Sequence, residues 1–201
     1  MQTNVVIPTN AKIAIIGAGF SGTMVAVHLR RRGVPVILFE QRARCGPGLA
    51  YDTNSPRFKL NVAADKMGAF PDDPSHFYRW LSERHAGTAP SDYVPRSWYG
   101  EYLEWLLAEV AMGEVSRERT HVQSITPDAH GVTIDAVAAH RVEHVVLAIG
   151  NIPRALPSHE QEIVSLPYDD ATYRDLSSLR ELTIVGTGLT AVDAVLECEA
   201  R

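Results

Sequence analysis

The stretch KIAIIGAGFSG, residues 12–22, decides the fold. It begins as a short apolar run rich in β-branched side chains, which is typical of a central parallel strand covered on both faces. Residues 23–32 follow with apolar side chains at helical spacing, and they end in three arginines that complement the negative end of a helix dipole. Gly33 suits the C-terminal cap. The buried-strand pattern returns in PVILFE, residues 35–40, so a βαβ unit is predicted.

Three glycines, Gly17, Gly19 and Gly22, form the turn between strand and helix. In a dinucleotide-binding turn the first allows a tight bend, the second lets the backbone approach a pyrophosphate, and the third lets the helix pack on the strand. The helix N-terminus offers N–H groups and a positive dipole end to the phosphates. Glu40 ends the next strand, where its carboxylate can bind a ribose diol and disfavours a 2′-phosphate. FAD or NAD is therefore expected here, the alternative being a plain tight turn.

The chain beyond this unit predicts helices and a small β meander. A Gly/Pro-rich stretch, residues 41–74, is too long for an ordinary connection and predicts a loop that covers a ligand. One helix is expected from a cap at Asp73-Pro74 to about His85, and another from a cap at Ser97. Short β segments are expected at residues 121–126, 132–137 and 142–149, as an antiparallel meander that returns to the main sheet.

A second strand-turn-helix pattern begins near the end of the sequence. LTIVGTG, residues 182–188, carries Gly186 and Gly188 in the fingerprint positions, and Ala191 stands at the third place, where alanine is an allowed replacement. This pattern predicts a second dinucleotide turn, or else a plain strand-turn-helix. Residues 151–181 carry proline turn signals and indicate a linker.

Composition and charge exclude several classes of function. The 201 residues are 45% hydrophobic and 21% charged, which excludes disordered, collagen-like and coiled-coil chains. A net charge of −5 leaves no basic surplus, so neither a nucleic acid nor a membrane is an expected partner. Cys45 and Cys198 lie far apart without metal-ligand spacing, so no metal site and a reducing compartment are expected. Without a signal peptide or a membrane-spanning apolar run, a cytoplasmic location is expected.

Further motifs between the two glycine turns carry a resemblance to a known superfamily. They are IIGAGFSGT (15–23), GLAYD (48–52), LNV (60–62), AFPDDP (69–74), VPR (94–96) and LAIGN (147–151). The chain resembles the two-dinucleotide-binding flavoproteins, in which the first motif holds FAD and the second holds NAD(P)H. Within them it is most similar to a bacterial group that includes FAD-dependent urate hydroxylase and amino-acid N-hydroxylase-like monooxygenases.

The resemblance implies a role for each matching residue. Gly17, Gly19 and Gly22 would line the FAD pyrophosphate, with Glu40 on the adenosine ribose and the loop of residues 42–51 beside the phosphates and flavin. Ala148-Ile149-Gly150 would link the two domains, and Gly186, Gly188 and Ala191 would receive the NAD(P)H pyrophosphate. The full expected cofactor-binding set is Gly17, Gly19, Phe20, Ser21, Gly22, Glu40, Gln41, Arg42, Gly48, Leu49, Asn61, Val122 (through its backbone), Ala148, Gly150, Gly186 and Gly188. Nearest the flavin, the expected residues are Asn61 and either Lys59 or Arg57.

The resemblance also implies an α/β architecture: a Rossmann-like FAD-binding domain at residues 1–157, with a parallel sheet and a β meander, then a linker at 158–181. The start of an incomplete NAD(P)-binding βαβ unit is expected at 182–201, and half a unit should pack poorly alone or dock elsewhere. The implied function is the N-terminal part of an FAD- and NAD(P)H-dependent oxidoreductase, a monooxygenase acting on a small molecule. The alternatives are a non-catalytic nucleotide-binding remnant and an NAD-dependent dehydrogenase that uses the first motif alone.

Overall fold

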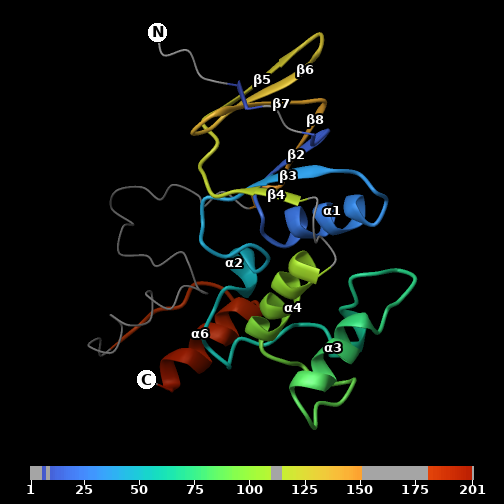
Figure 1. Cartoon of the computed structure of the whole chain (residues 1–201). Helices are drawn as coiled ribbons and strands as arrows, with labels where there is room; N and C mark the ends of the chain where they lie inside the picture. Colours follow the sequence, from blue (N-terminus) through green and yellow to red (C-terminus); the bar gives the residue numbers. More distant parts are fainter. Residues whose placement is uncertain (1–5, 8–9, 110–114, 151–180, 201) are drawn as a thin grey trace. The chain divides into compact units, whose positions relative to one another are not determined.

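The computed structural model describes residues 6–7, 10–109, 115–150 and 181–200. Its elements are β1 (Val6–Ile7), β2 (Ile13–Ile16), α1 (Phe20–Arg30), β3 (Val36–Phe39), α2 (Gly48–Tyr51), the 3-10 helix η1 (Ala64–Lys66), α3 (His76–Arg84), α4 (Arg96–Glu109), β4 (Val115–Glu118), β5 (Ser124–Asp128), β6 (Gly131–Asp135), β7 (Ala139–Val142), β8 (His144–Leu147) and α6 (Leu189–Glu199). Two compact units form: the first comprises residues 1–48 and 103–151, and the second comprises residues 49–102 and 152–201. Figure 1 shows the course of the chain.

A four-stranded parallel sheet organises the first unit. Its strand order is β4-β3-β2-β8, and β2 pairs in parallel with both β3 and β8. Ile15 lies between Leu38 on one side and Val146 on the other. The predicted βαβ unit of β2, α1 and β3 is therefore confirmed.

Both faces of this sheet are covered, as its unbroken apolar strands predict. On one face Ile15 packs in a cluster with residues of α1 and with Leu107 of α4. On the other face Ile16 and Phe39 pack with Ile134 of a second sheet, in which β5, β6 and β7 form an antiparallel meander. Figure 1 shows these three layers of the first unit, with α1 on one side of the parallel sheet and the meander on the other.

Several predicted boundaries in the first unit are wrong. α1 begins at Phe20 rather than Thr23, because Gly19 is already its N-cap. The segment expected at 142–149 corresponds to β8, which joins the parallel sheet, whereas β7, which closes the meander at residues 139–142, was missed apart from Val142. The meander strands β5 and β6 run at 124–128 and 131–135, so the tight turn lies between them. Two strands, β1 and β4, were not predicted; they pair in parallel with β7 and β3 respectively.

Aromatic side chains of α3 and α4 form the core of the second unit. The ring of Phe77 lies 4.9 Å from that of Tyr99 and 5.0 Å from that of Tyr102, centroid to centroid. Both expected helix caps are wrong: Asp73 pairs with Arg79 instead of capping α3, and Ser97 lies inside α4, which begins at Arg96. The stretch 41–74, expected as a loop, contains the short helices α2 and η1.

The end of the described chain forms a helix without the strand expected before it. Residues 182–188 have no regular secondary structure, whereas α6 begins directly after Gly188 as predicted. A strand needs a neighbour for its backbone hydrogen bonds, while a helix satisfies its own. The predicted linker, residues 158–181, falls almost wholly outside the described residues, so the predicted domain boundaries stay a prediction.

Candidate functional site

The turn between β2 and α1 has the close contacts that only glycines permit. Gly17 takes a φ of +98°, and a Cβ there would lie 2.4 Å from the carbonyl oxygen of Ala148. A Cβ on Gly22 would lie 1.8 Å from the carbonyl oxygen of Gly17, because the first turn of α1 packs directly on the bend. A tight bend and a close helix are both present.

The second glycine of the motif, Gly19, faces the loop that follows β3. A Cβ on Gly19 would lie 3.3 Å from the Cα of Gly48, and the N–H of Gly46 donates to the carbonyl oxygen of Ala18 at 2.7 Å. Gly48 itself has a φ of +60°. The loop expected to pass beside the phosphates thus lies against the turn that would bind them.

Glu40 is buried at the end of β3, and its carboxylate joins the glycine turn to Arg42. Its Oε2 accepts the N–H of Ala18 at 2.9 Å, and its Oε1 accepts the backbone N–H of Arg42 at 3.0 Å and its Nε–H at 3.3 Å. Burial alone would raise the pKa of Glu40, but these hydrogen bonds and the charge of Arg42 outweigh it and hold the pKa below its ordinary value of 4.5. Glu40 is therefore a fixed carboxylate at the edge of the turn.

The chain after β4 lies beside Glu40. Thr120 donates its N–H to the carbonyl oxygen of Glu40 at 3.1 Å, and the side chains of Gln41 and His121 meet at 3.0 Å. The side chain of Val122 packs against the core between the two sheets. Glu40, Gln41 and the backbone at residue 122, expected to hold the adenosine half of FAD, thus belong to one edge of the parallel sheet.

The Ala148-Ile149-Gly150 segment continues β8 past the same turn. The N–H of Ala148 donates to the carbonyl oxygen of Ile16 at 2.8 Å, which extends the pairing of β8 with β2. Gly150 has a φ of +73°, so the chain bends there. This segment, Phe20 and Ser21 all lie at the carboxyl end of the parallel sheet, which is where ligands bind in such folds.

Lys59 and Asn61, expected near the flavin, belong to the second unit. The segment of residues 58–60 pairs with residues 94–96, because Leu60 N–H donates to Val94 O at 2.8 Å and Arg96 N–H donates to Phe58 O at 2.7 Å. Phe58 and Leu60 are buried, while Lys59 and Asn61 are exposed. Their approach to a flavin stays a prediction, as does that of the exposed Leu49.

The second glycine motif differs from the first in its packing. No atom lies within 4 Å of a Cβ built on Gly186 or Gly188. Helix α6 is held within the second unit by acidic residues: Glu197 accepts the Ser55 hydroxyl at 2.5 Å and pairs with Arg57 at 3.5 Å, and Asp193 pairs with Arg96 at 3.8 Å. Arg57, expected as a charge near the flavin, thus has Glu197 as a partner.

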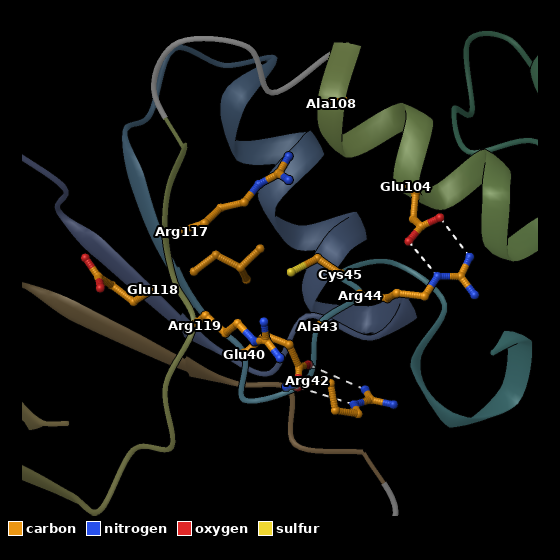
Figure 2. Close-up of a pocket in the computed structure, with 11 residues that line it drawn as sticks. Glu40, Arg42, Ala43, Arg44, Cys45, Glu104, Ala108, Arg117, Glu118 and Arg119 are labelled. Atoms are coloured by element: carbon orange, nitrogen blue, oxygen red, sulfur yellow. Dashed lines mark hydrogen bonds and ion pairs between the residues drawn. The ribbon is translucent and has the colours of Figure 1, made fainter. Parts of the chain in front are cut away.

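A cavity of about 400 Å³ lies on the helix side of β3 and β4 in the first unit (Figure 2). Arg42, Arg44, Arg117 and Arg119 line it, together with Glu40 and Cys45. Sequence reasoning named only Arg42 and Glu40 among them as site residues. The available signal was the repeated arginines in RAR (42–44) and RER (117–119), although Arg117 is the one among them that lies in a strand.

Metal-binding clusters and membrane-spanning helices are both absent from the described part of the chain. There, no group of three or more His, Cys, Asp and Glu side chains could hold a metal ion, and both cysteines are free thiols. None of the helices described has the length and apolar character needed to cross a bilayer.

Comparisons with known proteins agree with this geometry. A family model described as FAD-NAD(P)-binding matches residues 14–152. The nitrosuccinic acid synthase of Aspergillus oryzae is 25% identical in an alignment of 209 positions, and the match covers 87% of this chain and 30% of that protein. The chain therefore spans less than a third of the length of this curated relative.

Solved structures share the fold of the chain. The ornithine N-hydroxylase of Kutzneria sp. 744 has a TM-score of 0.58 at 25% identity, covering 75% of this chain and 39% of its own. A steroid monooxygenase bound to NADP has a TM-score of 0.55 at 19% identity. The match covers 73% of this chain and 27% of the steroid monooxygenase. The predicted Rossmann-type flavoprotein fold is confirmed.

Proposed function

We propose that this chain, which belongs to the FAD-NAD(P)-binding family, is the FAD-binding portion of an NAD(P)H-dependent monooxygenase that acts on a small molecule. The observation that carries the proposal is the turn between β2 and α1. Its glycines allow contacts that a side chain would block, α1 begins directly after it, and the Glu40 carboxylate is fixed at its edge.

The first unit fits the ADP half of FAD. The N-terminus of α1 offers backbone N–H groups and the positive end of the helix dipole to a pyrophosphate, and the first turn of α1 carries no acidic residue that would repel it. Phe20 and Ser21 lie in this first turn and are exposed. Glu40 would accept the ribose hydroxyls, with Gln41, Arg42 and the backbone of Val122 around the adenosine.

The remaining site residues would serve the flavin and the nicotinamide cofactor. When bound, FAD would supply the redox chemistry, by accepting a hydride from the nicotinamide and reacting with O₂. The Asn61 amide would donate or accept a hydrogen bond near the ring, and the Lys59 ammonium would hold negative charge there. Gly186, Gly188 and Ala191 would receive the NAD(P)H pyrophosphate at the start of α6.

The monooxygenase assignment draws its support from relatives at 25% identity. One is the ornithine N-hydroxylase, solved with FADred, NADP⁺ and L-orn, and the other is the nitrosuccinic acid synthase. Both names point to small organic substrates. The complete activity and its substrate belong to the proposal, because the chain spans only part of either protein.

The test is an absorbance spectrum of the purified chain before and after incubation with FAD and desalting. We expect the visible bands of oxidised flavin to stay with the protein. Glu40→Gln should retain less flavin, because it loses the carboxylate for the ribose, whereas Glu118→Gln, at the end of β4, should retain as much as the wild type.

A second measurement separates the alternatives. NADPH or NADH oxidation by the flavin-loaded chain, at rates well above those of free flavin, would support the enzyme assignment. Flavin retention without such oxidation would favour a non-catalytic nucleotide-binding protein. Tight NADH binding by a chain that retains no FAD would overturn the proposal in favour of a simple NAD-dependent enzyme.

A further inference from the structure

We infer that the arginine-lined cavity beside β4 is a second anion site, separate from the glycine turn, which takes a phosphate dianion, free or as the phosphate group of a small metabolite. This cavity, the β4 cavity, holds four arginines, at positions 42, 44, 117 and 119. The cavity shares Glu40 and Arg42 with the proposed FAD site, and Arg44 belongs to the loop expected beside the FAD phosphates. Arg117 and Arg119 have no role in the proposed binding of FAD, so the inference rests on these two residues.

The charges around the β4 cavity do not cancel. Arg42 pairs with Glu40, and Arg44 forms a two-pronged pair with Glu104 at 2.8 Å for both contacts. Arg117 and Arg119 have no carboxylate partner among the side chains that the structure describes. Glu118 stands between them in sequence and also lines the cavity, but Figure 2 shows its carboxylate directed away from the Arg117 guanidinium. The four arginines outnumber the three glutamates of the lining, Glu40, Glu104 and Glu118, and the Arg117 and Arg119 guanidiniums are the two that remain to receive an anion.

One of these two arginines is held in place by the fold. The Nη2–H of Arg117 donates to the carbonyl oxygen of Leu107, near the C-terminus of α4, at 2.9 Å. A guanidinium has five N–H donors in a rigid fork, so this single bond fixes its direction and leaves donors for a ligand. Arg119 follows two residues later, just past the end of β4, and it also lines the cavity (Figure 2).

The chemistry of the cavity favours phosphate. Guanidinium forks bind phosphate oxygens through paired hydrogen bonds to charged groups, which are stronger than neutral ones. The volume of about 400 Å³ lies within the range of small-molecule sites, and Leu38 and Ala108 give it an apolar wall. A small phosphomonoester could therefore place its phosphate on the arginines and its organic part on that wall.

Cys45 gives a direct reporter of occupancy. It lines the same cavity and is half-buried. Burial raises the pKa of its thiol, while the positive charge of Arg117 acts in the opposite direction. An anion bound beside Arg117 would block access to the thiol and also weaken that positive charge. Both effects slow alkylation of Cys45.

The experiment measures the rate at which iodoacetamide, a neutral reagent, alkylates Cys45. It uses a Cys198→Ser background, because the chain has only two cysteines. Rates are compared in inorganic phosphate, in glycerol 3-phosphate and in chloride at equal ionic strength, with flavin-loaded and flavin-free protein. We expect saturable protection of at least several-fold by phosphate and none by chloride. If glycerol 3-phosphate protects at lower concentrations than phosphate, the ligand is the phosphate group of a metabolite. If phosphate protects at lower concentrations, the ligand is the free ion.

Matched variants tie the protection to the arginines. Arg117→Gln and Arg119→Gln should each weaken the phosphate affinity about tenfold or more, since a hydrogen bond to a charged group is lost. Arg32→Gln is the control: Arg32 also donates to a backbone carbonyl, that of His28 at 3.0 Å, but lies at the end of α1 outside the cavity. It should leave the protection unchanged.

Two outcomes would overturn the inference. Protection that does not saturate, or that chloride gives equally well, would mean only general ionic screening. Protection seen in flavin-free protein but abolished by FAD would mean that the cavity is part of the FAD site. Neither outcome depends on whether the loaded chain oxidises NAD(P)H, so failure here is distinct from failure of the proposed function.

Discussion

At the scale of single residues, substitution of Gly22 by alanine has two opposing effects, a gain in helix propensity and a steric clash. Alanine would favour the interior of α1 by about 1 kcal/mol. Its Cβ, however, would lie 1.8 Å from the Gly17 carbonyl oxygen, a backbone atom that cannot rotate away. Overpacking of this kind typically costs about 1–3 kcal/mol. We expect Gly22→Ala to lower the free energy of unfolding, measured by urea titration, by roughly 2 kcal/mol.

The matched control is Gly188→Ala at the start of α6. Gly188 has an ordinary φ of −76°, and nothing lies within 4 Å of a Cβ built on it. Gly188 is the N-cap of α6, where alanine is worse than glycine, so its substitution should lower the free energy of unfolding by no more than about 1 kcal/mol. If both variants lost the same amount, close packing at the first turn would not be the cause.

Glu40 links stability to pH. In the folded protein its pKa lies below the ordinary value of 4.5, so the unfolded chain binds this proton more strongly. The carboxylate therefore stabilises the fold at pH values above 4.5, and that contribution is lost as the pH falls through the folded pKa. The difference in unfolding free energy between wild type and Glu40→Gln should be largest near neutral pH and shrink in acid. A constant difference would contradict this role.

The sequence was informative about residues whose role is local. Gly17 and Gly22 were predicted because a tight bend and a close helix involve neighbours along the chain. Arg117 and Arg119 were not predicted as site residues, because their relation to Arg42 and Cys45 exists only once β4 pairs with β3. The position of Glu40 in the sequence likewise does not show that its carboxylate accepts the N–H of Ala18.

At the scale of elements, α6 docks by its polar side. Glu197 is 3% exposed, whereas Leu189 and Val192 are 60% and 50% exposed. Removing Glu197 would take away the carboxylate that accepts the Ser55 hydroxyl and pairs with the Arg57 guanidinium. Loss of one partner of a buried pair is strongly destabilising. Glu197→Ala should lower the hydrogen-exchange protection of the α6 amides about tenfold or more. Val192→Ser, on the exposed side, should leave the protection of these amides nearly unchanged. A larger loss of protection in Val192→Ser than in Glu197→Ala would contradict this docking.

The sequence predicted the elements that have a clear local pattern and missed those that depend on a partner. Strands β2 and β3 are unbroken apolar runs, so they were recognised. Strand β4, with the sequence VSRE, has one neighbour at the sheet edge and no apolar pattern, so it was missed. The strand expected at residues 182–186 did not form, because backbone pairing depends on a partner that local sequence does not supply.

At the scale of the whole molecule, ligand binding should couple the glycine turn to global stability. A ligand that binds only the folded state adds about 2.7 kcal/mol at one hundred times its Kd, which for a chain of this size raises the Tm by roughly 5–10 °C. We expect saturating FAD to give such a shift. ADP carries the pyrophosphate and ribose that the first unit would bind, so it should also raise the Tm. Riboflavin lacks both and should raise it least.

The order of these three ligands tests where the binding energy arises. Glu40→Gln should reduce the shifts caused by FAD and ADP and leave that of riboflavin unchanged, because Glu40 would contact only the ribose of the nucleotide half. A melt unaffected by FAD would contradict the proposed cofactor. A rise with riboflavin but not with ADP would remove the glycine turn and Glu40 from the binding site, since the flavin ring alone would then account for the affinity.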